Sequence, residues 1–421
     1  MKFMSTILTH LFLQSTQAAL LPEDGPATIP EARDSLGSSI VWTKCKLPKG
    51  LDSKRVPKVD CASLPVPLDY TKKYSGKDIQ LDLIRFRATK KPFKGSIIVN
   101  PGGPGGSGVQ LVLGRGPQMA KIVGGHHDII GFDPRGTGNT LLPSSDPGFV
   151  GLLLSGAYGL VQQARSDQEW MDYAWQYTGN ITETFFVVKP ENMRFYGTAF
   201  VARDILAIAN ALGEGRKINY WGMSYGTVLG QVLASMFPDR IGRMLLDGNL
   251  LADDYVTNFG ANGIRETEKA LTHFSDQCIS AGPEMCSVAT ELSKRGGILQ
   301  VFGYVELAHR LKSALNSDLN KFNISSPFGE SEENGVSHLA ILCGDSSFRA
   351  ESPGDLFSFY QDQRSQSPFV DAELLSSLPC VQWKVRAAEP INLRRLQKVE
   401  TKSPILIVNG AYDPVTPLGD A

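Results

Sequence analysis

Short runs of apolar residues recur along the chain and are typical of strands buried in a sheet. The first run alternates apolar and polar positions, and the later ones are nearly continuous. The runs lie at residues 79–89, 95–99, 128–132, 218–221, 241–246 and 404–408. Residues 198–212 instead repeat apolar side chains at helical spacing before Gly213, which indicates a helix with a glycine C-cap. Strands alternating with helices predict an α/β fold.

The alternation is lost in the second half of the chain. Residues 251–400 contain several helical segments and none of the strand runs. We therefore expect one sheet domain, formed by residues 20–250 and 401–421, into which residues 251–400 are inserted as a mainly helical cap. A chain of 421 residues is long enough for a large α/β domain with such an insertion.

The segment from Cys45 to Tyr70 contains prolines at positions 48, 57, 65 and 67. Proline lacks the N–H group that a central strand donates to its neighbour. This segment is therefore predicted to be irregular or to lie at a sheet edge. Residues 20–40 are rich in proline, serine, glycine and alanine and are expected to form a loose arm.

Residues 1–19 have the features of a secretory signal peptide. Lys2 provides a positive start, an apolar stretch follows, and alanines at 18 and 19 offer a cleavage site. Two glycosylation sequons, at Asn180 and Asn323, fit the same route. We expect a protein that is secreted or delivered to a vacuole or another lumen.

The six cysteines are an even number, which favours disulfides in a secreted chain. Six cysteines permit fifteen pairings, and sequence alone does not choose among them. Pairing of neighbours along the chain is our expectation, and scattered buried thiols are the alternative. The expected pairs are Cys45–Cys61, Cys278–Cys286 and Cys343–Cys380.

Composition excludes several classes of partner. Hydrophobic residues make up 42% and charged residues 20% of the chain, as in an ordinary globular protein. The formal net charge of −1 gives no reason to expect nucleic acid. No run is long and apolar enough to span a bilayer. The sequence shows no metal-ligand cluster of cysteines and histidines, and no cofactor is expected; oligomeric state is left open.

The strongest chemical signal is the segment from Lys217 to Thr227. It predicts a short strand, a sharp G-x-S-x-G turn with Gly222, Ser224 and Gly226 at the fixed positions, and then a helix. A serine on such a strained turn brings its backbone close to the neighbouring strand and helix, where only glycine leaves room. The hydroxyl of Ser224 is expected to stand exposed above the sheet as a nucleophile. The N–H of Tyr225 would lie at a helix N-terminus, which favours negative charge.

A glycine run from Asn100 to Gly108 is the second signal. It directly follows the strand at 95–99, and a phosphate-binding loop is disfavoured because no Gly-Lys-Ser/Thr follows. We interpret it as an oxyanion loop, in which Gly102 and Gly103 bring a backbone N–H to the substrate carbonyl beside Tyr225. The alternative is a flexible glycine turn.

Acidic residues follow three of the predicted strands. Asp413 comes after the last strand, and Asp247 ends an earlier one. A structural turn aspartate is the favoured interpretation of Asp247. Asp133 and Arg135 follow the strand at 128–132 and are expected to fix their loop by a local ion pair, and a catalytic role for Asp133 is the less favoured alternative.

Taken together, these segments resemble the α/β-hydrolase superfamily, and within it the tripeptidyl aminopeptidase-like and prolyl aminopeptidase-like serine hydrolases. The matching segments occur in family order over roughly residues 95–417. They are Asn100–Gly105, Gly131–Gly136, Tyr220–Thr227, Phe237–Ile241, Asp247–Gly248 and Asp413–Pro417.

The resemblance implies a secreted or vacuolar peptidase that cleaves amide bonds near free peptide N-termini through an acyl-enzyme. It makes Ser224 the nucleophile, Asp413 the acid with Asp247 as the second choice, and Tyr225 and the loop at 102–106 the oxyanion donors. An acidic side chain in the cap is then expected to bind the substrate amine, and the sequence does not single it out. The alternatives are an esterase or lactonase acting on a small metabolite and a catalytically dead binding protein.

One group of the expected machinery is missing from the sequence. A serine nucleophile needs a base, and in this fold the order is serine, acid, histidine. No histidine follows His338, and the six are His10, His126, His127, His273, His309 and His338. We expect each of them to be a surface or packed residue, and a histidine recruited from the cap as the base is the alternative. The expected interpretation is a truncated product that lacks the last strand and closing helix, leaves residues 404–408 as an exposed apolar edge, and has little or no activity.

Overall fold

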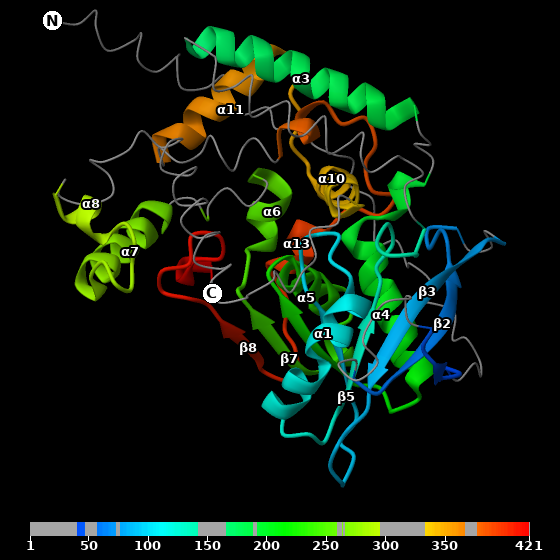
Figure 1. Cartoon of the computed structure of the whole chain (residues 1–421). Coiled ribbons are helices and arrows are strands. Elements are labelled where there is room, and N and C mark those ends of the chain that lie inside the picture. Colours follow the sequence, from blue (N-terminus) through cyan, green and yellow to red (C-terminus); the bar gives the residue numbers. More distant parts are fainter. Residues whose placement is uncertain are drawn as a thin grey trace, which may run out of the picture.

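The fold was taken from a computed structural model of the whole chain (Figure 1). The structure describes residues 40–46, 57–72, 76–141, 166–187, 192–258, 263, 266–294, 333–366 and 377–420. The expected signal peptide at 1–19, His10, His309 and the sequon at Asn323 lie outside the described residues.

The described strands form one eight-stranded sheet in the order β1-β2-β3-β5-β4-β6-β7-β8. The first three strands pair antiparallel with one another and β3 pairs antiparallel with β5, whereas β5, β4, β6, β7 and β8 run parallel. The α/β fold with a mostly parallel sheet is confirmed. The strands are β1 (Thr43–Lys44), β2 (Val59–Pro67), β3 (Asp78–Phe86), β4 (Ser96–Asn100), β5 (Asp128–Phe132), β6 (Ile218–Met223), β7 (Ile241–Asp247) and β8 (Ile405–Val408).

Strand β2 was not predicted as a regular strand, and its prolines explain how it forms. Pro65 and Pro67 pair with β3 on one side. On the other side β1 pairs only with Asp60 and Cys61. Both prolines therefore lie where β2 is an edge, so their missing N–H groups break no pairing there. Residues 59–67 therefore form the edge structure that was one of the two predicted outcomes.

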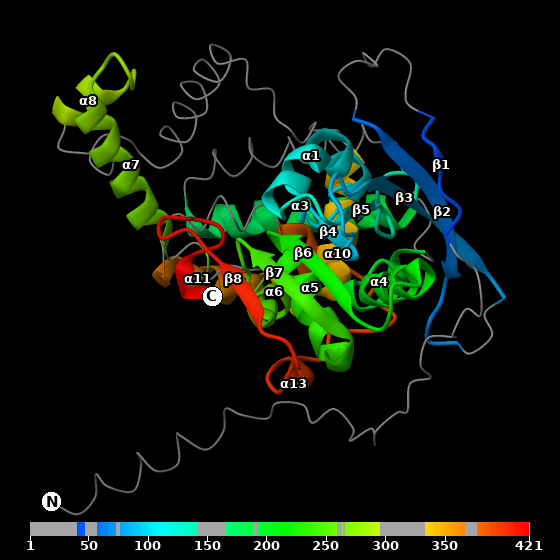
Figure 2. The ribbon, with the colours of Figure 1, turned by 90° about the horizontal axis from the view of Figure 1, so that it is seen from below.

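Different helices cover the two faces of the sheet (Figure 2). Helix α1 (Gly108–Ile122) lies on one face, where Val99, Ile129 and Trp221 belong to its apolar cluster. Helices α4 (Thr198–Leu212) and α5 (Tyr225–Met236) lie on the other, in the larger core of the molecule. The bounds of α4 agree with the predicted helix, and Gly213 caps it with a left-handed backbone.

The described part of residues 251–400 is helical, as predicted for a cap. Four of its segments, α6, α10, α11 and η5, contribute buried apolar residues to the core that also contains α4 and α5, and α13 packs against that core. Helix α3 (Asp167–Val187) packs on η5. Helices α7 and α8 extend away from the rest (Figures 1 and 2). The elements are α6 (Ala252–Asn258), α7 (Thr267–Ala281), α8 (Ala289–Lys294), α10 (Glu333–Asp345), α11 (Pro353–Gln366), η5 (Leu378–Gln382) and α13 (Leu393–Leu396). The exact domain bounds stay a prediction.

Three disulfides join all six cysteines, and the predicted neighbour pairing is confirmed. Cys45–Cys61 ties β1 to β2, and Cys278–Cys286 closes the end of α7. Cys343–Cys380 joins α10 to η5 inside the cap, with both residues fully buried.

The predicted ion pair between Asp133 and Arg135 is wrong. Arg135 is fully buried and its guanidinium donates to both carboxylate oxygens of Asp204 on α4, at 2.7 and 2.9 Å. Asp133 instead accepts hydrogen bonds from the Ser107 hydroxyl at 2.5 Å and the Val109 amide at 3.2 Å. It therefore holds the start of α1, directly after the glycine run.

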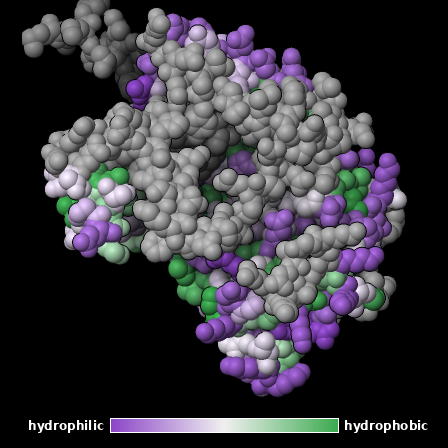
Figure 3. Space-filling view, in the orientation of Figure 1, coloured by the Kyte–Doolittle hydropathy of each residue, from purple (hydrophilic) through white to green (hydrophobic). Residues whose placement is uncertain are grey.

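Strand β8 forms the far edge of the sheet and carries exposed apolar side chains, as predicted. Leu406 is 61% and Val408 45% exposed. Figure 3 shows hydrophobic surface where Figure 1 places β8. Beside it, a hollow of about 680 Å³ lies over β4, β6, β7 and β8 on the face of the sheet that carries α1, lined by Ile97, Trp221 and Leu245 among others. Among the described helices, none combines the length and the apolar character needed to cross a membrane.

Candidate active site

Ser224 stands on the turn between β6 and α5, where the sequence predicted it. Its backbone has φ 54° and ψ −127°, a left-handed conformation that is strained for a residue with a side chain. The Ser224 amide donates to the Asp247 carbonyl at 3.0 Å, which pins the turn to the end of β7. The side chain is half-buried and does not cap α5. The Ser224 hydroxyl therefore accepts no hydrogen bond from the N-terminal amides of α5.

The flanking glycines leave the room that the motif requires. A Cβ atom on Gly222 would lie 2.1 Å from the Gly226 carbonyl oxygen, and one on Gly226 would lie 2.8 Å from the Asn100 carbonyl oxygen. Real Cβ atoms do not approach that closely. Tyr220 adds a hydrogen bond of 2.7 Å from its hydroxyl to the Gly226 carbonyl. Strand, turn and helix thus meet at backbone contact distance.

The glycine run touches this turn. A Cβ atom on Gly102 would lie 2.9 Å from the Ser224 Cβ and 3.0 Å from the Tyr225 amide nitrogen. The Gly102 amide itself donates to the Asn100 side chain at 3.0 Å, so it is not available to a substrate. The Gly103 amide makes no hydrogen bond to any described residue. The structure therefore leaves Gly103 rather than Gly102 with a free donor, and Gly102 provides the close approach.

Tyr225 is the first residue of α5, and its amide has no acceptor within the described part of the chain. Free amides at a helix N-terminus attract negative charge. Because Gly102 contacts this nitrogen, the glycine run and the helix start form one surface beside Ser224.

Asp413 lies in the loop after β8 and is held by its own loop. It accepts hydrogen bonds from the amides of Val415 and Thr416, each at 2.9 Å, and from the Thr416 hydroxyl at 2.7 Å. Burial opposes ionisation, but these bonds outweigh it and hold the pKa of Asp413 below its ordinary value. A Cβ atom on Gly248 would lie 3.1 Å from Thr416 Oγ1 and 3.9 Å from the Ser224 amide nitrogen. The acid loop therefore abuts the serine turn.

Asp247 also ends a strand beside Ser224. Its carboxylate accepts a long hydrogen bond of 3.4 Å from the Trp221 indole, on the α1 face of the sheet. Its carbonyl holds the Ser224 amide. These contacts support the structural interpretation of Asp247.

Two of the described histidines lie near the site and two lie far from it. His126 and His127 bond the carbonyls of Pro92 and Gly95 at the start of β5, the end of the sheet opposite Ser224. The other two come from the cap. The His273 ring stacks on Tyr412, next to Asp413, with centroids 3.7 Å apart.

His338 lies against the glycine run. Its Nδ1 is 3.3 Å from the Pro104 carbonyl oxygen, and burial lowers the pKa of the ring. A neutral ring that donates from Nδ1 keeps Nε2 as an acceptor. Neither His273 nor His338 forms a hydrogen bond with Ser224 in the described residues.

Sequence reasoning missed the residue that joins the acid loop to the sheet. The Asn409 amide group donates to the carbonyls of Asn249, Thr416 and Pro417, and its oxygen accepts from the Asn249 amide at 3.0 Å. A polar residue directly after the last strand was the available signal. Asn409 ties the loops after β7 and β8 together and so positions Asp413 beside the serine turn.

The other predicted polar sites are placed as follows. Asn180 lies on α3 and is exposed, whereas Thr182 of the same sequon is buried and its hydroxyl faces the Pro379 carbonyl. Two cap acids are already engaged: Asp345 is buried and hydrogen bonded, and Glu389 pairs with Arg203. The described residues therefore do not assign the amine-binding acid.

Comparison with protein families agrees with this geometry. Residues 95–267 match a model described as the alpha/beta hydrolase fold, and residues 367–421 match one described as TAP-like protein. The first match covers the glycine run and the serine turn, and the second covers β8 and the acid loop.

The chain belongs to the α/β-hydrolase superfamily.

Similar proteins of known sequence include two named peptidases. This α/β hydrolase is 29% identical over 326 residues to the serine protease Hip1 of Mycobacterium tuberculosis, covering 74% of this chain and 57% of Hip1. It is 27% identical over 452 aligned positions to the tripeptidyl aminopeptidase of Streptomyces lividans, covering 93% of this chain and 78% of that protein. The match thus spans less than three fifths of the length of Hip1.

Solved structures are more distant. The proline iminopeptidase of Mycobacterium smegmatis aligns with 84% of this chain and 83% of its own at 13% identity and a TM-score of 0.31. The family of this α/β hydrolase therefore follows from the sequence models and from its own sheet, turn and loop.

Proposed function

We propose that this α/β hydrolase is a serine hydrolase that forms an acyl-enzyme on Ser224. The observation that carries the proposal is the strained Ser224 backbone, at φ 54°, next to the Tyr225 amide, which has no acceptor among the described residues. The glycine run that carries the Gly103 amide approaches the same turn through Gly102. A left-handed backbone at a non-glycine residue is retained only where the surroundings impose it, and such strain is concentrated at functional sites.

The geometry supports acyl transfer. Ser224 Oγ attacks the substrate carbonyl carbon, and the oxygen that becomes negative is received by the Tyr225 and Gly103 amides. Each donor of this kind is worth roughly 3–4 kcal/mol of barrier. Asp413 is ionised at neutral pH because its loop donates three hydrogen bonds to it, and it would orient the base and stabilise that base when protonated. Collapse of the tetrahedral intermediate breaks the scissile bond and releases the amine with the proton from Ser224, which leaves the acyl group on Ser224 Oγ. Water then adds to the acyl carbon, the ester bond to Ser224 breaks, and the acid leaves while Ser224 regains a proton.

The base is the unassigned member of this machinery. Serine is a poor nucleophile until a neighbouring group takes its proton. Neither described cap histidine is bonded to Ser224, and the printed sequence has no histidine after His338. We therefore expect slow turnover by the chain as printed, at about the residual 10³–10⁴-fold over water that an oxyanion hole and binding supply alone.

For the substrate, we propose amide bonds near free peptide N-termini. The support is the similarity to the proteins named serine protease Hip1 and tripeptidyl aminopeptidase. Three disulfides also suit an oxidising compartment, and so support export through a signal peptide at residues 1–19 with glycans at Asn180 and Asn323.

A fluorophosphonate probe tests the nucleophile. We expect labelling of the wild type, loss of labelling in Ser224→Ala, and retention in Ser235→Ala, a matched serine on the same helix that bonds the Val232 carbonyl. Equal labelling of all three chains would refute Ser224 as the nucleophile. No labelling of any chain would favour a dead binding protein.

Substrate preference is tested on the same protein. A chromogenic tripeptide amide with a free amino end is expected to be cleaved faster than its N-acetylated form. Cleavage of p-nitrophenyl esters without cleavage of either amide would favour the esterase or lactonase alternative.

A further inference from the structure

A buried polar chain links the cap to the residue that follows the nucleophile. Asp345 ends α10 and is only 4% exposed. Its carboxylate accepts hydrogen bonds from the Thr198 amide at 3.0 Å, the Thr198 hydroxyl at 2.5 Å and the Tyr255 hydroxyl at 3.3 Å. The Thr198 hydroxyl is also bonded to the Tyr225 hydroxyl. Three elements, α10, α4 and α6, thus meet at one carboxylate, and α5 joins them through the Thr198 hydroxyl.

The direction of the hydrogen bonds in this chain follows from the chemistry of its ends. An ionised carboxylate only accepts hydrogen bonds, and a threonine hydroxyl has one proton to give. Thr198 therefore donates to Asp345 and accepts from the Tyr225 hydroxyl. Tyr225 thus donates to Thr198 and Thr198 donates to Asp345, because the carboxylate at the end of the chain can only accept.

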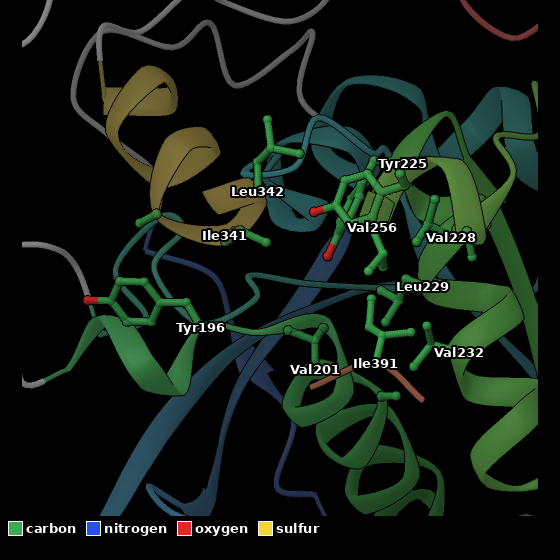
Figure 4. Packing of buried hydrophobic residues seen from close by; sticks show 14 of the residues in the cluster. Tyr196, Val201, Tyr225, Val228, Leu229, Val232, Val256, Ile341, Leu342 and Ile391 are labelled. Carbon is green, nitrogen blue, oxygen red and sulfur yellow. The ribbon is translucent and has the colours of Figure 1, made fainter. Parts of the chain in front are cut away.

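The chain ends on the side chain whose own backbone carries an oxyanion donor. The Tyr225 side chain belongs to the same buried cluster as Leu342 of α10 and Val256 of α6 (Figure 4). Its ring centroid is 5.4 Å from that of Tyr255. With the hydroxyl anchored at one end and the strained Ser224 peptide at the other, the Tyr225 amide has little freedom to move.

Burying the Asp345 carboxylate costs folding free energy, which argues against an incidental contact. Burial raises the pKa of Asp345 to about 6, and the hydrogen bonds from Thr198 and Tyr255 oppose that shift without cancelling it. No described cation contributes to this balance. A buried carboxylate without a cation destabilises a fold relative to a neutral side chain of similar size. Perturbed groups of this kind are concentrated at functional sites.

We propose that Asp345 is a positioning residue that holds Tyr225 through Thr198, and so couples the seating of cap helix α10 to the oxyanion donor beside Ser224. The inference rests on the proposed role of Ser224 and Tyr225. It assigns Asp345 no contact with the substrate, in keeping with its burial and its engaged oxygens.

Two variants break the chain and two matched variants keep it. Asp345→Asn replaces one of the two oxygens that accept from the Thr198 amide and hydroxyl by an NH2 donor, and Thr198→Val removes the relay hydroxyl. Thr198→Ser keeps that hydroxyl, and Tyr255→Phe removes the longest bond to Asp345 without touching the link to Tyr225. We expect the first two variants to lower kcat on an ester substrate roughly 10- to 100-fold with little change in KM, as for a displaced oxyanion donor. The two matched variants should stay close to the wild type.

Amide hydrogen exchange over residues 223–229 gives a readout that needs no turnover. We expect faster exchange in Asp345→Asn and Thr198→Val than in the wild type and Tyr255→Phe. Wild-type kcat and exchange in both chain-breaking variants would overturn the proposal, as would Thr198→Ser behaving like Thr198→Val. If Asp345→Asn does not fold, the comparison of Thr198→Val with Thr198→Ser tests the proposal by itself.

Failure of the proposed function is seen separately. If the wild type neither turns over nor labels, that function is rejected, and the exchange comparison alone then decides whether Asp345 anchors Tyr225.

Discussion

The two halves of the proposed active site are held by different kinds of contact. In the nucleophile half, formed by β6, the start of α5 and the glycine run at 100–108, backbone atoms meet so closely that one added carbon would collide at 2.1 Å. In the acid half, formed by β8 and residues 409–420, the polar side chains of Asn409 and Asp413 bond the backbone. The first half is set by packing and the second by separable hydrogen bonds.

Their surroundings differ as well. The nucleophile half lies between α1 on one face and α4 and α5 on the other. The acid half lies at the sheet edge, where Leu406 is 61% exposed. One half therefore tolerates almost no change in volume, whereas the other can be loosened one bond at a time. The predictions below test this contrast, from the largest expected effect to the smallest.

Adding one carbon to the nucleophile half should have the largest effect. Gly222→Ala places a Cβ atom 2.1 Å from the Gly226 carbonyl oxygen. Because backbone must move to make room, we expect a loss of about 3 kcal/mol or more of unfolding free energy in urea. The control is Gly114→Ala in α1, where a Cβ atom meets nothing within 4 Å. That change should stabilise the helix by up to about 1 kcal/mol. A stable Gly222→Ala chain would contradict the crowding argument.

Breaking the side-chain bonds of the acid half should loosen that half alone. Asn409→Ala removes four hydrogen bonds to the loops after β7 and β8. At a net worth of about 0.5–1.5 kcal/mol each, we expect a local loss of about 2 kcal/mol and roughly 30-fold faster amide exchange over residues 409–418. Asn139→Ala, which removes one exposed bond to Asp82, should leave exchange unchanged. Equal exchange in wild type and Asn409→Ala would show that packing also holds the acid half.

Asp133, which accepts a hydrogen bond from Ser107 of the nucleophile half, and Asp413 of the acid half should affect the pH dependence of stability in opposite directions. Burial raises the pKa of Asp133, beside the glycine run, from 3.8 to about 6, so its share of stability is present below 3.8 and lost as pH rises through 6. The stability of the wild type relative to Asp133→Asn should therefore fall by about 2 kcal/mol between about pH 4.5 and 7.5. Urea unfolding at both values measures it, and a pH-independent difference would contradict it.

Asp413 provides the contrast. Its pKa is held below 3.8, so its stabilising share is present above that value and lost only as pH falls through the lowered pKa. The difference between wild type and Asp413→Asn should be flat over the range in which Asp133 responds.

The smallest effect on stability is expected at the exposed edge. Leu406→Lys puts a charge on an unpaired apolar strand edge, where it should reduce self-association measured by light scattering. Unfolding free energy should change by no more than about 0.5 kcal/mol. Val415→Lys, equally exposed but outside the strand, is the control and should change neither. Unchanged scattering in Leu406→Lys would show that β8 does not drive association.

Local patterns predicted much of the fold. The strand runs, the helix at 198–212 and the serine turn came from spacing along a few residues, and the neighbour pairing of cysteines was correct. Strand β2 was missed because its prolines are compatible with a strand only at an edge, and sequence does not say which strands lie at edges.

The site was predicted less completely than the fold. Ser224 and Asp413 were placed by motif, but the choice of Gly103 over Gly102 depends on a hydrogen bond from Gly102 to the Asn100 side chain. The Arg135 partner was wrong because Asp204 is 69 residues away along the chain. Nothing near Arg135 in sequence points to it.

By itself, the sequence determined the order of strands and helices and the strained turn at Ser224, since both depend on the spacing of apolar residues and glycines within one element. Only the tertiary structure decided which polar groups meet. Asp345 reaches Thr198 across 147 residues, and Asn409 reaches Asn249 across 160. Such contacts are fixed by how the sheet, the helices and the cap pack, because a buried polar group must find a partner in space wherever that partner lies in the chain.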